Sequence, residues 1–95
     1  MAAIGVLTLE LRLEYSHSLK DKRHVVKSLQ DRLRGKFNVA VAEIDHQDLW
    51  QRSAIAVVTV SSDHVHAGKV LRSVEDEAAA LLGPELVQAT VEWLE

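Results

Sequence analysis

The spacing of the apolar residues, more than any other feature of the chain, limits the folds that it can adopt. In residues 7–13 every second residue is leucine and the others are polar, a pattern that predicts a half-buried strand. Apolar residues recur at helical spacing in residues 19–34 and 64–82, whereas residues 37–44 and 86–94 alternate again. Residues 53–61 are apolar on both sides, as in a central strand. The predicted order is therefore strand, helix, strand, strand, helix, strand.

The limits of both helices are marked by capping residues. Ser18 stands three residues before Asp21, which predicts a capping box at the start of the first helix, and Gly35 suits the position just past its end. The residues predicted to face the core from this helix are Leu19, Val26, Leu29 and Leu33. The second helix is expected to begin after Ser61–Asp63 and to end at Gly83, with Ala67, Leu71, Val74, Ala78 and Leu81 facing inward.

This order of elements predicts an α+β ferredoxin-like βαββαβ sandwich. Two βαβ units with right-handed crossovers give a four-stranded antiparallel sheet with both helices on one face and the first and third strands in the centre. Ninety-five residues suit a single domain over 1–95. On the sheet face away from the helices we expect a modest apolar patch of Ala40, Ala42, Ile55 and Val57.

Several activities that this fold supports in other proteins lack the residues they need here. The chain has no cysteine, which excludes disulfides, thiolate metal sites and a cysteine nucleophile. The loop Glu14–Ser18 contains neither the glycine nor the arginine of an acyl-phosphatase-type anion cradle. We therefore expect no enzymatic activity, no catalytic residues and no cofactor. Because the chain has no signal peptide and no apolar stretch of about 20 residues, we expect a cytoplasmic protein without membrane association.

The sheet face is also a poor candidate for stacking RNA bases, because sheet-face RNA binders need exposed aromatic side chains on their central strands. Aromatic residues make up only 4% of the chain. The positions where aromatics would be needed are expected to hold Thr8, Glu10, Arg12 and Thr59.

Positive charge is concentrated in one segment of an acidic protein. The net charge is −3, but residues 17–36 hold seven basic residues against two acidic ones. On a helix, four of these basic residues fall within an arc of about 60°; they are Lys20, Arg23, Lys27 and Arg34. Such a row is suited to contacting phosphates without sequence preference. A solvated helix face is the alternative, since Asp31 lies within reach of Lys27 and Arg34.

Lys22 belongs to the same basic segment but points toward the apolar side of the predicted helix. We expect its aliphatic stem to lie along apolar residues near the helix end while its ammonium reaches water.

The connection between the second and third strands combines residue types found in metal and acid–base sites. Asp45, His46 and Asp48 lie within four residues of one another. Aspartates in a short hairpin more commonly bond local backbone amides, so no metal site is predicted. Trp50 is expected either to close the edge of the core or to form an interface, and Arg52 is a neighbouring candidate contact.

Four segments of the chain resemble the YlxP-like family of small bacterial proteins. They are SLKDKR at 18–23, VVKSL at 25–29, FNVAVAE at 37–43 and DHQDLWQR at 45–52. The resemblance implies a ferredoxin-like fold but supplies no established activity or catalytic residue. It also implies, through gene neighbourhood alone, an association with RNA or the ribosome. Because residues 45–52 carry part of the resemblance, their value as an interaction site rises.

The sequence therefore leads to two functional hypotheses. In the first, a non-enzymatic accessory protein contacts ribosomal RNA or a ribosome particle through Lys20, Arg23, Lys27 and Arg34. Candidate interaction residues in the hairpin are Asp45, His46, Asp48, Trp50 and Arg52. The alternative is a protein-interaction module or homodimer that binds no nucleic acid, with the acidic run 75–77 available to a partner's basic helix.

Overall fold

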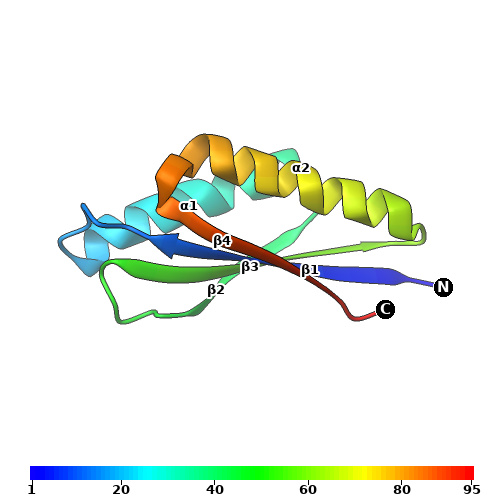
Figure 1. The fold of residues 1–95 in the computed structure, drawn as a ribbon, viewed down its shortest axis with the longest axis horizontal. Helices are drawn as coiled ribbons and strands as arrows, with labels where there is room; N and C mark the ends of the chain where they lie inside the picture. Colours follow the sequence, from blue (N-terminus) through cyan, green and yellow to red (C-terminus); the bar gives the residue numbers. More distant parts are fainter.

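The computed structural model describes residues 1–95 as one sheet covered by two helices (Figure 1). The elements are β1 (Ala3–Arg12), α1 (Leu19–Lys36), β2 (Ala40–Asp45), β3 (Arg52–Ser61), α2 (His64–Leu82), the short 3₁₀ helix η1 (Gly83–Glu85) and β4 (Leu86–Trp93). The strands are antiparallel in the order β2-β3-β1-β4. The predicted ferredoxin-like topology, with the first and third strands central, is confirmed.

The two faces of the sheet differ in cover. Both helices lie on one face, and no element of the chain covers the other, which we call the open face (Figure 1). The β1–α1 and β2–β3 loops lie together at the end of the molecule opposite the two termini. Neither helix is long and apolar enough to span a membrane.

The core forms between the helices and the odd-numbered residues of the central strands. Leu7 pairs with Val57 and Leu9 with Ile55, and all four side chains are fully buried. The helices add mainly Val26, Leu29, Leu33, Leu71, Val74 and Ala78. The prediction that Ile55 and Val57 lie on the open face is therefore wrong.

The register of β3 explains this error. Ala40 and Ala42 pair with Val58 and Ala56, so these even-numbered residues of β3 are the ones that share the open face with the two alanines. The expectation that Thr59 lies on the open face is also wrong, because Thr59 pairs with Gly5 on the helix side and is buried.

The start of α1 agrees with the sequence, but its end does not. The backbone N–H of Asp21 donates to Ser18 Oγ at 3.0 Å, which is the first bond of a capping box. The Asp21 carboxylate accepts at 3.0 Å from the N–H of His17, one residue before the cap, instead of from Ser18. The helix continues through Gly35 to Lys36, so Gly35 is not a C-terminal cap. An ion pair of 2.6 Å between Lys36 Nζ and Glu77 of α2 holds the last turn in place.

Helix α2 begins at His64 and is capped by Asp63, whose Oδ1 accepts from the N–H of Val65 at 3.0 Å. At its other end Leu82 is buried whereas Leu81 is exposed, so the buried row of α2 ends at Leu82. The inward assignment of Leu81 is therefore wrong. Gly83 ends the helix with φ 58° and ψ −130°, a positive-φ conformation that glycine adopts without strain.

Strand β2 begins at Ala40, three residues later than the alternation predicts. Phe37 instead terminates α1, donating its N–H to the Leu33 carbonyl at 2.9 Å, and it packs half-buried against the core. The shorter β2 forms one edge of the sheet and carries a register shift between Glu43 and Asp45.

Candidate functional site

The cations of α1 point in three directions, and each direction has a different electrostatic setting. On the side toward α2, Arg32 and Lys36 both contact Glu77, with N–O distances of 2.9 and 2.6 Å. The hydrogen bond from Lys36 and the positive charges of Lys36 and Arg32 hold the pKa of Glu77 below its ordinary value. One residue of the acidic run 75–77 thus meets a basic helix of its own chain.

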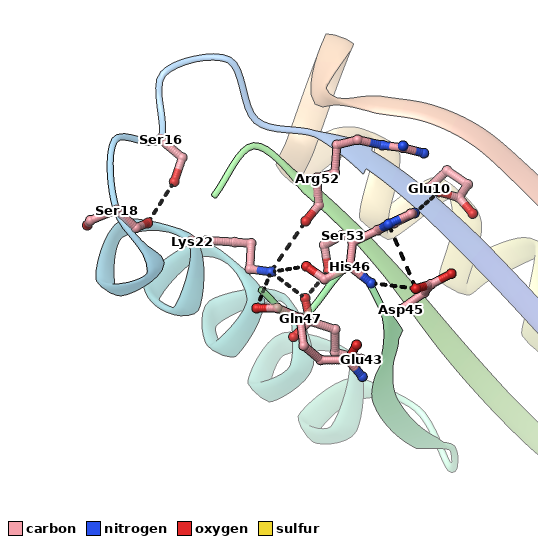
Figure 2. A network of polar contacts seen from close by, with 10 residues as sticks. All are labelled: Glu10, Ser16, Ser18, Lys22, Glu43, Asp45, His46, Gln47, Arg52 and Ser53. Carbon is pink, nitrogen blue, oxygen red and sulfur yellow. Dashed lines mark hydrogen bonds and ion pairs between the residues drawn. The ribbon is translucent and has the colours of Figure 1, made fainter. Parts of the chain in front are cut away.

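Lys22 lies on the inner side of α1 and is almost completely buried, at 1% exposure. Its ammonium pairs with Glu43 at 3.1 Å, and Figure 2 shows it pointing into the β2–β3 connection. It donates to the carbonyl oxygens of His46 at 2.7 Å, Gln47 at 3.1 Å and Arg52 at 3.3 Å. The expectation that this ammonium reaches water is wrong, because the hairpin folds back over the first turns of α1 and surrounds it with acceptors.

The network around Lys22 extends into the sheet. Glu43, besides pairing with Lys22, accepts a hydrogen bond of 2.6 Å from the hydroxyl of buried Ser53 (Figure 2). No buried side-chain nitrogen or oxygen lacks a partner in the protein. A buried charge that is paired and hydrogen-bonded in this way fixes the position of the surrounding backbone, here residues 46–52.

At the tip of the hairpin, the Asp45 carboxylate accepts a hydrogen bond from the backbone of the turn itself. The N–H of His46 donates to Asp45 Oδ1 at 2.7 Å, and the N–H of Leu49 donates to the His46 carbonyl at 3.0 Å. His46 adopts φ 63°, and its ring lies 4.0 Å from Glu10 Oε2 (Figure 2). The Asp48 side chain contacts neither Asp45 nor His46 through a hydrogen bond or ion pair. No three His, Asp or Glu side chains lie close enough together to hold a metal ion. The arrangement is that of a turn.

Trp50 projects outward from this fixed hairpin. Its side chain is 53% exposed, and neighbouring Leu49 is 46% exposed, so Trp50 does not close the core. Both line a shallow surface depression with Asp48, Gln51 and Arg52. The Gln51 amide donates to the carbonyls of Glu14 and Ser16 at 3.1 and 3.2 Å, which ties the hairpin to the β1–α1 loop. The structure thus presents an aromatic ring on a supported loop.

The remaining cations lie on the outer side of α1, next to β2. Lys20, Arg23 and Lys27, which we call the outer α1 surface, are exposed and line a shallow depression together with Asp21 and His24. Lys27 pairs with Asp31 at 3.2 Å, whereas neither Lys20 nor Arg23 forms an ion pair. Arg34 belongs to the same side, and its guanidinium donates to the Val41 carbonyl of β2 at 2.7 Å. The structure therefore brings the four predicted residues to one side but leaves only two without a partner.

Comparison with solved structures supports the fold. A de novo designed protein, Foldit4, superposes with a TM-score of 0.65 at 11% identity, covering 100% of this chain and 98% of the other. A dimeric ferredoxin-like protein of unknown function from Thermobifida fusca gives a TM-score of 0.58 at 14% identity, covering 98% and 90%. Similarity at this level of identity concerns the fold alone.

Comparison of sequences identifies the family. The chain is 41% identical over 71 residues to the uncharacterized protein YlxP of Bacillus subtilis strain 168, covering 75% of this chain and 77% of that protein. The model of a family described as a protein of unknown function, DUF503, matches residues 4–91. The resemblance found in the four sequence segments thus extends over most of the domain, and the chain belongs to the YlxP-like DUF503 family.

Proposed function

We propose that this protein is a non-enzymatic accessory protein that contacts the phosphate backbone of ribosomal RNA through the outer α1 surface. The observation that carries the proposal is the division of the α1 cations. Lys22 pairs with Glu43, and Arg32 and Lys36 share Glu77, while Lys20 and Arg23 have no acidic partner. Cations left unpaired on an exposed helix are available to phosphates.

The spacing of the outer α1 surface suits a nucleic-acid strand. Lys20 and Lys27 are seven residues apart on α1, a rise of about 10 Å. One strand of double-stranded DNA carries a phosphate about every 3.4 Å along the axis, and on this scale about three phosphates fit the length. Lys27 exchanges its exposed pair with Asp31 for a phosphate at low cost, since such a surface pair contributes about 0–1 kcal/mol.

The hairpin supports a second contact. Lys22 holds residues 46–52 beside the first turns of α1. Trp50 and Arg52 belong to this segment, and Lys20 lies in the first turn of α1. An exposed indole stacks on an unpaired base irrespective of sequence, and such stacking contributes about 1–3 kcal/mol per base. In this proposal α1 binds the backbone and Trp50 contacts an unstacked base.

Co-sedimentation with ribosomal particles tests the proposal. The double variant Arg23→Glu/Lys27→Glu should bind several-fold more weakly than the wild type, because it replaces two phosphate-binding cations by carboxylates. The matched control is Lys69→Glu/Arg72→Glu, which changes the net charge by the same amount at exposed positions of α2.

The control separates a directed contact from a general effect of net charge. If the phosphates meet α1, the α2 variant keeps most of its binding. Equal losses in both variants would assign the binding to net charge alone, and unchanged binding in the α1 variant would refute the proposal. Both variants should retain the far-ultraviolet circular dichroism of the wild type, because all four positions are exposed.

A further inference from the structure

The sequence of β3 is that of a strand covered on both faces. Its odd-numbered residues, among them Ile55 and Val57, lie in the core beneath the helices. Of its even-numbered residues, Ala56, Val58 and Val60 lie on the open face, whereas Ala54 is buried. An antiparallel sheet with a solvated face normally carries polar residues there. The chain itself leaves the open face bare (Figure 1).

The neighbouring strands extend this apolar surface. Val60 pairs with Ile4 of β1, Val58 pairs with Val6 of β1 and Ala40 of β2, and Ala56 lies next along β3. These six residues form a continuous area, which we call the open-face patch. Val60 is 59% exposed although valine is an apolar residue. A patch of this kind in one molecule marks an interaction surface.

We infer that the open-face patch binds a second copy of this chain in a symmetric dimer. Val60 pairs with Ile4 and Val58 with Val6 across β1 and β3. A two-fold axis that runs parallel to the strands, above the open face and over the line midway between β1 and β3, therefore gives a self-complementary contact. It places Val60 of one protomer on Ile4 of its partner, and Val58 on Val6. Two copies of one twisted sheet also match in shape, since aligned sheets pack face to face at about −30° and about 10 Å apart.

The size of the open face suits a dimer. Ten residues of β1 extend over about 34 Å, and four strands extend over about 15–19 Å, so each protomer offers roughly 500–600 Å². Two protomers together then bury about 1,000–1,200 Å², near the lower limit of stable protein interfaces. The open-face patch suits the centre of such an interface, because the fully buried core of an interface is more apolar than its rim.

A polyanion is a poor occupant of the open face. No lysine lies on this face. Its two arginines, Arg12 and Arg52, stand opposite each other on β1 and β3 at one end of the sheet, beside the hairpin. Glu10 and Glu92 share the face with the patch. The open face and the outer α1 surface therefore serve different partners, and the dimer does not depend on the proposed RNA contact.

Sedimentation equilibrium at micromolar concentrations tests the inference directly. The wild type should sediment as a dimer, and a wild type that stays monomeric throughout would overturn the inference without any variant. Val60→Glu should sediment as a monomer, because it places a carboxylate in the apolar contact. This variant is expected to fold, since Val60 is 59% exposed in the single chain.

A matched valine controls for non-specific effects. Val65, on α2, is 66% exposed, and Val65→Glu should remain a dimer. If Val65→Glu is monomeric, the interface lies on the helices instead. If Val60→Glu is still a dimer, the open-face patch is not part of the interface.

Mixing two variants tests the arrangement of the protomers. Ile4→Lys should be monomeric by itself, like Val60→Glu, because each variant puts a charge against an apolar partner. In the mixture, the glutamate of one chain meets the lysine of the other, while the second pair of the interface keeps its native Ile4 and Val60. An equimolar mixture should therefore form a heterodimer, and a mixture that stays monomeric would refute this two-fold arrangement.

Discussion

At the scale of single residues, Lys22 is the position where sequence and structure differ most. It falls on the apolar arc of α1 with Val26, Leu29 and Leu33, and this placement was visible in the sequence. Its partners were not visible, because the carbonyls that it binds lie 24–30 residues further along the chain. A lysine within an apolar helical arc indicates burial, but only the folded hairpin shows which acceptors make burial possible.

Lys22→Met should therefore destabilise the protein strongly. Removing one partner of a buried pair leaves the Glu43 carboxylate and three carbonyls without their donor, and such changes lower the free energy of unfolding by about 3–5 kcal/mol. Urea denaturation measures the loss. Lys20→Met, on the exposed side of the same helix, should change stability by less than about 0.5 kcal/mol. Similar small effects at both positions would show that the ammonium of Lys22 is not buried.

At the scale of elements, the two glycines near the helix ends have opposite roles. Gly35 lies inside α1, and a Cβ there would contact nothing within 4 Å, so Gly35→Ala should stabilise the protein by up to about 1 kcal/mol. Gly83 has φ 58° and ψ −130°, so Gly83→Ala should cost about 1–3 kcal/mol. Thermal unfolding of both variants checks the pair. A destabilising Gly35→Ala substitution would restore the sequence-based view of Gly35 as the helix cap.

The contact between α1 and α2 should depend on pH through Glu77. Because the pKa of Glu77 is lowered in the folded protein, its ion pairs stabilise the fold above the ordinary value of 4.5 and lose this effect as the pH falls through the lowered pKa. Glu77→Gln should therefore lower the urea midpoint at neutral pH and have little effect once the wild-type carboxylate is protonated. A difference between the two proteins that stays constant or grows in acid would contradict the role of Arg32 and Lys36 as its partners.

At the scale of the whole molecule, the sequence predicts the order and layering of helices and strands better than it predicts which face of the sheet a residue occupies. Apolar spacing determines the order of elements and the central strands, because each element must bury its own apolar side. The faces of β3 are ambiguous, since the strand is apolar on both sides and only its register with β1 and β2 separates Val57 from Val58. The same holds for the cations of α1: their helical positions follow from the sequence, whereas their division between Glu43, Glu77 and solvent follows from packing.

The salt dependence of RNA binding tests the central claim, that the outer α1 surface meets phosphates, most directly. With about three phosphate contacts, the affinity of the wild type for a ribosomal RNA fragment should fall with salt at a log–log slope of about −2 to −3. Arg23→Glu/Lys27→Glu should bind more weakly and flatten this slope by about one to two units, because two contacts are lost. Lys69→Glu/Arg72→Glu should keep the wild-type slope. The same slope in the wild type and the α1 variant would contradict the claim.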